Sequence, residues 1–194
     1  SVAQKILDNE ERLVIGAQNF TESLILGDIY SELIEAKTDI PVEKTYNLNG
    51  TMITVAALES GDIDMFTDYT GVLAPNVLKL PMETDTEKVY EDVKSGLKKQ
   101  FAPIGCSNTY VLAVPQEVSE KYNLTKLSQL ITQAPNLHLG CTTAFTQRED
   151  LLPKMKKDFG INFKEVVGLE GNIRYQAITS REVEVTDAYE TDAL

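Results

Sequence analysis

Cysteine, histidine and tryptophan are scarce in this chain. Its 194 residues include two cysteines, one histidine and no tryptophan. Cys106 and Cys141 are too few for a disulfide framework, and their spacing matches no metal site. His138 stands in an apolar stretch, which favours a structural residue at a strand edge. The usual zinc sites and histidine-based catalytic sites are therefore excluded, and we expect neither a metal nor a cofactor.

The familiar catalytic sequence motifs are also missing. The chain has no phosphate loop, no Gly-x-Gly-x-x-Gly after a strand and no Gly-x-Ser-x-Gly elbow. Its acidic pairs, Asp62 with Asp64 and Glu149 with Asp150, fall where carboxylates normally cap helices or face solvent. The sequence therefore indicates no enzyme site.

Positive charge is in short supply. Lys and Arg number 18 against 30 Asp and Glu, which gives a formal net charge of −12. Such a chain repels nucleic acid and anionic lipid, whereas it tolerates a cationic or zwitterionic ligand. There is no run of 18 or more apolar residues, and residues 1–12 lack the pattern of a signal peptide. We expect any segment that exports or tethers the protein to lie outside this sequence.

Strand and helix patterns alternate along a chain whose hydrophobic fraction, 42%, is that of a globular protein. Strands are predicted at 13–17, 41–46, 63–66, 110–114, 137–140, 163–167 and 183–187, and helices at 24–34, 55–58, 84–100, 146–159 and 173–179. This order predicts an α/β fold with mainly parallel sheets in two lobes, residues 1–106 and 107–194. Each lobe contains a late strand with an aspartate, which leaves a duplicated architecture open.

Three tyrosines occupy the positions where such sheets usually bind ligands. Tyr69, Tyr110 and Tyr189 each fall at or just beyond a predicted strand end, and ligands gather at strand ends, at helix N-termini and in clefts between lobes. A trimethylammonium group donates no hydrogen bond, so proteins hold it with electron-rich ring faces. We interpret these three as candidate ligand-binding rings. The tyrosines expected to pack instead are Tyr30, Tyr90 and Tyr122.

Two polar residues are candidates for the other end of such a ligand. Arg148 is predicted near the start of a helix after Thr146, where its guanidinium and the helix N-terminus both suit a carboxylate. The other interpretation of Arg148 is a surface ion pair with Glu149 or Asp150. Gln18 follows the first strand directly and offers an amide.

Six segments match one protein family in order along nearly the whole chain. They are Ile15–Glu22, Gly61–Met65 with Asp68–Gly71, Asn108–Tyr110, Arg148–Asp150, Arg174–Ile178 and Asp187–Asp192. On these segments the chain resembles the substrate-binding proteins of osmoprotectant ATP-binding-cassette importers, the glycine betaine, carnitine and choline group. The resemblance implies the type II periplasmic-binding-protein fold, with two α/β lobes closing over a ligand cleft.

The resemblance also implies roles for individual residues. Tyr69, Tyr110 and Tyr189 would form an aromatic cage, and Gln18 and Arg148 would hold the polar or carboxylate end of the ligand. The implied protein is extracytoplasmic, is not an enzyme, binds no nucleic acid, and passes its ligand to a membrane permease that recognises the closed form.

Two features depart from the family pattern. Val72 stands where members commonly have a polar residue three positions after the first cage tyrosine, which leaves choline open beside the carboxylate-bearing ligands. Members also continue past the position of Leu194, return to the first lobe and supply another cage aromatic. One alternative is a ligand-sensing effector domain of a regulator, which requires a DNA-binding segment outside this sequence. Another is an enzyme on the same scaffold, which requires a reactive constellation that the sequence lacks.

Overall fold

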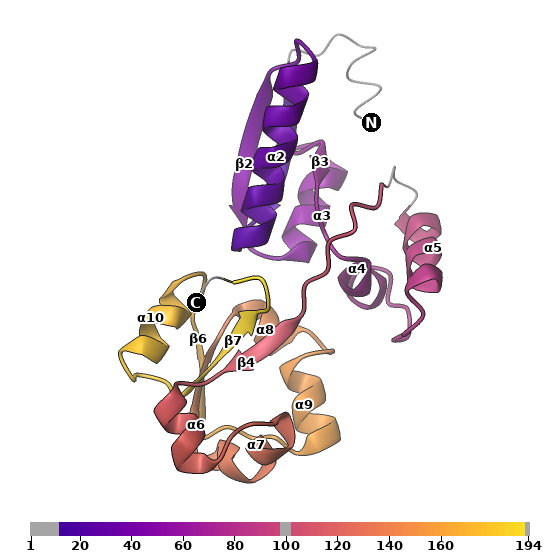
Figure 1. Cartoon of the computed structure of the whole chain (residues 1–194). Coiled ribbons are helices and arrows are strands. Elements are labelled where there is room, and N and C mark those ends of the chain that lie inside the picture. Colours follow the sequence, from indigo (N-terminus) through magenta and orange to yellow (C-terminus); the bar gives the residue numbers. More distant parts are fainter. Residues whose placement is uncertain (1–11, 98–101, 193–194) are drawn as a thin grey trace. The chain divides into compact units, whose positions relative to one another are not determined.

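The computed structural model describes residues 12–97 and 102–192 (Figure 1). These residues form two compact units, the first extending to Ser107 and the second beginning at Asn108. Both units mix helices and strands. In the described part of the chain, no helix is both long enough and apolar enough to cross a membrane.

The first unit is a parallel sheet with helices packed against it. Its elements are β1 (Leu13–Gln18), α2 (Thr21–Lys37), β2 (Val42–Leu48), α3 (Thr51–Ser60), β3 (Met65–Phe66), α4 (Thr70–Asn76) and α5 (Thr86–Leu97). The strand order is β2–β1–β3, and both neighbours of β1 run parallel to it. Strand β1 is buried along its whole length, which explains its nearly continuous apolar sequence.

Helix α2 confirms the predicted helix but turns its small residues inward. Its buried positions are Ser23, Gly27 and Ser31, one turn apart. A Cβ atom on Gly27 would lie 2.7 Å from the Tyr46 hydroxyl, so the missing side chain lets α2 approach β2 closely. The apolar residues of α2 that are about half exposed are Ile25, Ile29 and Leu33. Close approach through small side chains, and not an apolar stripe, seats this helix.

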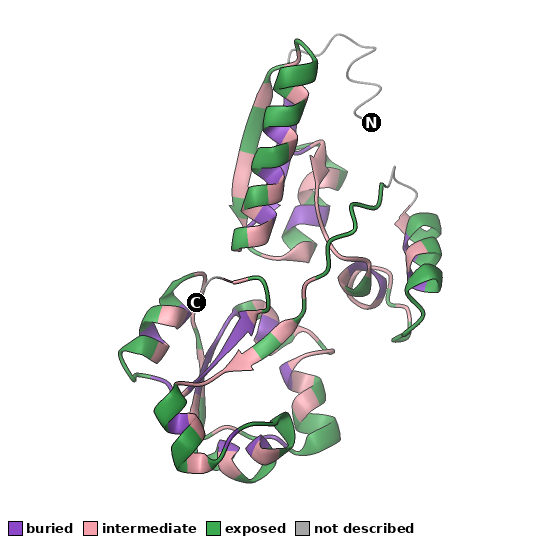
Figure 2. Ribbon diagram, in the orientation of Figure 1, coloured by how far each residue is buried: buried purple, intermediate pink, exposed green. Residues whose placement is uncertain are grey.

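The second unit is a mixed sheet surrounded by helices. Its elements are β4 (Tyr110–Ala113), α6 (Gln116–Tyr122), α7 (Leu127–Gln133), the 3-10 helix η1 (Ala134–Asn136), β5 (His138–Cys141), α8 (Thr143–Gln147), α9 (Leu152–Phe159), β6 (Glu165–Gly168), α10 (Ile173–Thr179) and β7 (Val185–Tyr189). The strand order is β4–β7–β5–β6, antiparallel at β4–β7 and parallel elsewhere. Figure 2 shows buried residues concentrated in β5 and β7, where Leu139 and Val185 are fully buried.

Both units repeat one local arrangement in front of their late strands. In the first unit, the Asp64 carboxylate accepts a 2.8 Å hydrogen bond from the backbone N–H of Val14 at the start of β1. In the second, the Glu184 carboxylate accepts a 2.8 Å bond from the N–H of His138 at the start of β5. Each carboxylate thus fastens the strand that follows it to its parallel neighbour. The two units therefore share this local arrangement of a carboxylate before the late strand and an N–H group of the parallel neighbour.

Candidate functional site

Tyr110 and Tyr189 form a ring pair at one edge of the second sheet. Tyr110 begins β4, Tyr189 ends β7, and the antiparallel register sets them opposite each other. Their ring centroids are 4.7 Å apart with the planes at 48°, and the hydroxyl oxygens are 2.9 Å apart. Burial raises the pKa of both phenols, so both stay neutral at physiological pH. The strand pairing therefore delivers two neutral aromatic rings to one place.

Arg148 does not lie at a helix start, contrary to the prediction from the sequence. The expected helix over 146–159 is two helices, because α8 ends at Gln147 and α9 begins at Leu152. Arg148 caps the C-terminus of α8, where its N–H donates to the Ala144 carbonyl at 3.0 Å. The break has a physical cause in Pro153, which lacks an N–H and is tolerated only in the first turn of a helix.

The Arg148 guanidinium nevertheless reaches the ring pair. Its Cζ lies 5.4 Å from the centroid of the Tyr110 ring. Nε donates to one carboxylate oxygen of Asp150 at 3.0 Å, and Nη2 donates to the other at 2.6 Å. Burial opposes the charged form, but Asp150 outweighs it and raises the pKa of Arg148. The result is a bidentate ion pair whose remaining N–H groups can serve a ligand carboxylate.

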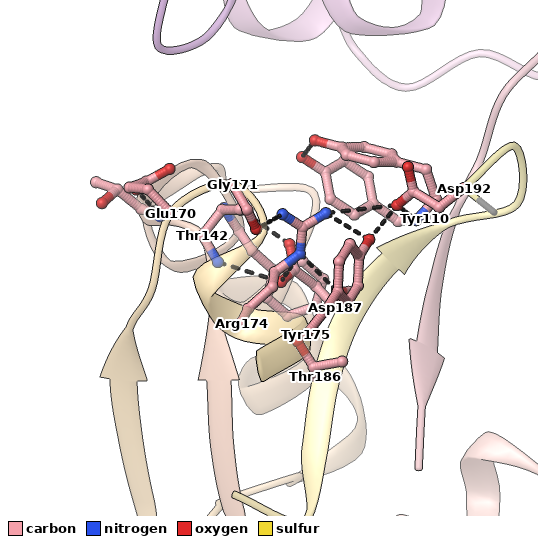
Figure 3. Close-up of polar contacts among 12 residues, drawn as sticks. Tyr110, Thr142, Glu170, Gly171, Arg174, Tyr175, Thr186, Asp187 and Asp192 are labelled. Carbon is pink, nitrogen blue, oxygen red and sulfur yellow. Dashed lines mark hydrogen bonds and ion pairs between the residues drawn. The ribbon is translucent and has the colours of Figure 1, made fainter. Parts of the chain in front are cut away.

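Arg174, whose Cζ lies near the Tyr189 ring, is the more buried of the two arginines, at 2% exposure. Figure 3 shows its guanidinium between α10 and β7, where Nε donates to the Asp187 carbonyl at 3.0 Å and Nη1 donates to the Gly171 carbonyl at 2.6 Å. The Asp187 carboxylate accepts hydrogen bonds from the hydroxyl of Thr142 at 2.8 Å and from its N–H at 3.2 Å. Burial raises the pKa of Asp187, while Arg174 and Thr142 act against that rise.

The same guanidinium connects the end of β7 to the turn after it. Arg174 Nη2 donates to the Tyr175 hydroxyl at 2.7 Å, and that hydroxyl donates to the Asp192 carboxylate. Asp192 also accepts the backbone N–H of Tyr189 at 3.1 Å. The Cζ of Arg174 is 4.3 Å from the Tyr175 ring and 5.6 Å from the Tyr189 ring. The backbone N–H of Tyr189 is therefore bound by Asp192, and its ring lies near the buried ion pairs of Arg174.

The first unit offers a smaller group around Tyr69. Tyr69 follows β3 and caps the N-terminus of α4, and its hydroxyl donates to the Glu22 carboxylate. Gln18, at the end of β1, is 7% exposed, and its amide donates to Asp68 at 2.9 Å. Asp68 in turn accepts the N–H of Tyr69 at 2.8 Å. The ring of Phe20 lies 6.4 Å from that of Tyr69.

Tyr69 and Tyr189 occupy matching positions of the repeated arrangement. Tyr69 stands five residues after Asp64, and Tyr189 stands five residues after Glu184. Each carboxylate accepts an N–H group near the beginning of the neighbouring parallel strand, from Val14 in β1 and from His138 in β5. Each unit therefore presents a tyrosine at the equivalent sheet edge.

The structure brings Tyr110, Tyr189 and Arg148 together in the second unit and sets Gln18 beside Tyr69 in the first. Sequence reasoning placed Asp187 at the rim of the ligand cleft but assigned no role to Arg174 or Asp192. The signal was available, because these residues fall within the family-matching segments Arg174–Ile178 and Asp187–Asp192. Across residues 12–97 and 102–192, no group of three or more His, Cys, Asp or Glu side chains is arranged to hold a metal ion.

Solved structures place the fold in one class. One is a crystal structure described as a glycine betaine/carnitine/choline ABC transporter, 28% identical, with a TM-score of 0.62 over 93% of this chain and 69% of that one. Another is YehZ of Escherichia coli in its apo form, 25% identical, with a TM-score of 0.55 over 93% of this chain and 70% of that one. The predicted α/β periplasmic-binding-protein class is confirmed.

Sequence comparison narrows the class to a family. The family model for the substrate-binding domain of the ABC-type glycine betaine transport system matches residues 11–194, and the chain belongs to that family. It is 33% identical to the ergothioneine transport permease/ergothioneine binding protein EgtU of Helicobacter pylori, over 95% of this chain and 34% of that protein. It is 32% identical to the carnitine transport binding protein OpuCC of Listeria monocytogenes, over 95% of this chain and 62% of that protein.

The family model and these relatives are substrate-binding parts of transporters and not enzymes, in agreement with the prediction from the sequence. Substrate-binding proteins of ABC transporters bind small ligands and work with a permease. The chain spans about a third of the ergothioneine protein and less than two thirds of the carnitine protein.

Proposed function

We propose that this chain binds a small quaternary-ammonium compound outside the cytoplasm. The complete protein delivers this ligand to a membrane permease. The observation that carries the proposal is the pair of neutral rings, Tyr110 and Tyr189, 4.7 Å apart. A trimethylammonium group has an apolar surface and a positive charge, and a pair of electron-rich rings suits both properties.

Three rings do not account for tight binding alone. Each ring contributes about 0.5 to 2 kcal/mol, whereas a micromolar dissociation constant corresponds to about 8 kcal/mol. We therefore assign Arg148 in the second unit and Gln18 in the first to the polar end of the ligand, and Tyr69 to the cage. Glycine betaine, carnitine and ergothioneine all join a trimethylammonium group to a carboxylate, while choline carries a hydroxyl.

Val72 bears on the choice among these ligands. Its side chain offers no hydrogen bond, so Arg148 must bind the carboxylate of such a ligand. Arg148 already pairs with Asp150 at 2.6 Å. Choline has no carboxylate and does not need a cationic partner at this end. Both groups of ligand therefore belong in the test.

The test is a calorimetric titration with matched pairs that differ only in N-methylation. Choline is compared with ethanolamine and glycine betaine with glycine, and carnitine and ergothioneine complete the series. The proposal predicts saturable binding of at least one methylated compound and none of its unmethylated partner. Equal binding within a pair, or no binding of any methylated compound, contradicts it.

A further inference from the structure

The ring of Tyr189 lies beside a buried cation. The Cζ atom of Arg174 is 5.6 Å from the ring centroid, and the arginine side chain is 3% exposed. A cation near an aromatic ring draws on the same ring electrons that would attract a second cation, and two cations repel each other. With its charge unbalanced, Arg174 would make Tyr189 a poor partner for a quaternary ammonium.

Two carboxylates balance that charge. Asp187 Oδ1 lies 3.4 Å from Arg174 Nε, and Asp192 Oδ2 lies 3.5 Å from Nη2. Asp187 is also bound by Thr142 and built into β7. Asp192 lies in the turn after β7 with its side chain 6% exposed, and it accepts the N–H of Tyr189 itself. It is therefore the counter-ion most closely linked to the ring.

We propose that Asp192 sets the preference of Tyr189 for a cationic group, because its negative charge offsets that of Arg174 and leaves the ring attractive to an ammonium. This inference rests on the proposed function. It places a determinant of ligand charge behind the cage, in a residue that is separate from Tyr69, Tyr110, Tyr189, Gln18 and Arg148.

A purely structural role for Asp192 makes a different prediction. Its Oδ2 atom accepts from the Tyr175 hydroxyl and the Tyr189 N–H, and these bonds need an oxygen acceptor and not a charge. Asparagine has the same size and keeps an acceptor oxygen, but it removes the charge. Glutamate keeps the charge and alters the length. The pair Asp192→Asn and Asp192→Glu therefore separates charge from geometry.

The experiment measures by calorimetry the affinity for choline, or for the methylated compound that binds best, of the protein, of both Asp192 variants and of a matched control. The control is Asp158→Asn, an exposed aspartate on α9 that pairs with Lys154 at 2.7 Å. We expect Asp192→Asn to weaken choline binding about tenfold and Asp192→Glu to stay within about threefold of the unaltered protein. Asp158→Asn should leave the affinity unchanged. The fitted stoichiometry reports the folded fraction separately from the affinity.

The inference is overturned if Asp192→Asn binds choline as tightly as the unaltered protein. It is equally overturned if Asp192→Glu is the weaker of the two variants, since geometry and not charge then matters. Failure of the proposed function gives a different result, because the unaltered protein would then bind none of choline, glycine betaine, carnitine and ergothioneine.

Discussion

Tyr110 and Tyr189 face each other across the β4–β7 pair, with their hydroxyl oxygens 2.9 Å apart. The contact joins residues 79 positions apart in the sequence. Because the backbone register fixes both rings, a ligand that uses them meets a preformed surface.

The first prediction concerns the rings themselves. Replacement of either Tyr110 or Tyr189 by Ala removes one ring, so affinity for every trimethylammonium ligand should fall by about 2-fold to 30-fold. Tyr189→Phe keeps the ring and should stay within about threefold, since the hydroxyl contributes little to a cation. Calorimetry measures the affinities. Equal losses in the Ala and Phe variants would assign the effect to the hydroxyl contact and contradict a ring-based site.

The second prediction concerns ligand carboxylates. Arg148→Ala should weaken glycine betaine or carnitine about tenfold or more, because a charge-assisted hydrogen bond is lost. Choline should change by no more than about threefold. Arg181, an exposed arginine paired with Glu117, provides the control substitution. A loss for choline as large as that for the carboxylate ligands speaks against this role.

The third prediction concerns the packing that supports the site. A Cβ atom on Gly140 in β5 would lie 2.8 Å from a methyl group of Leu169 and 3.0 Å from one of Val183. Because the branched Val183 is stiff and buried, Gly140→Ala should lower the free energy of unfolding by about 1 to 3 kcal/mol. Gly168 in the neighbouring strand has open space around its Cβ position. Urea unfolding of Gly168→Ala should therefore show a change of about 0.5 kcal/mol or less, and equal losses would refute the packing account.

The fourth prediction concerns acid stability. Burial acts to raise the pKa of Glu184, but the N–H and imidazole of His138 outweigh burial and hold that pKa below its ordinary value of 4.5. A carboxyl group whose pKa is lowered by folding stabilises the protein above its unfolded pKa, and the contribution is lost as the pH falls through the folded value. Glu184→Gln should therefore cost about 1 kcal/mol or less at pH 6.

That cost should shrink as the pH falls from 4.5 through the lower pKa of the folded state, because the native glutamate becomes protonated only there. Chemical unfolding at several pH values measures it, with the exposed Glu182→Gln as the control. A cost that stays constant down to the most acidic condition would show that the charge of Glu184 is not involved.

Much of the fold could be predicted because the spacing of apolar residues identifies the strands and the longer helices. The strands at 13–17 and 137–140 are present as β1 and β5, each within a residue or two of the predicted ends. Short helices were missed at α4, α6 and α7, each of seven residues, since two turns give too few periods to detect. The predicted helix over 146–159 is divided in two near Arg148 because of Pro153. The prediction gave more weight to the spacing of apolar residues than to this proline.

The site was predictable to the extent that it depends on strand ends. The tyrosines could be selected because a strand end is visible in the sequence. The contacts around Arg174 could not, because they join Gly171, Asp187 and Asp192 through the three-dimensional packing of α10 against β7. For Arg148, the alternative of an ion pair with Asp150 describes its observed contact, and the position at a helix start was wrong.

The most direct test of the central claim is nuclear Overhauser contact between the N-methyl protons of bound choline and the ring protons of specifically labelled tyrosines. The account predicts cross-peaks from the methyl protons to Tyr110 and Tyr189, and none to Tyr90 on helix α5. Bound choline, or the methylated compound that binds best, with no contact to either ring of the pair would contradict it.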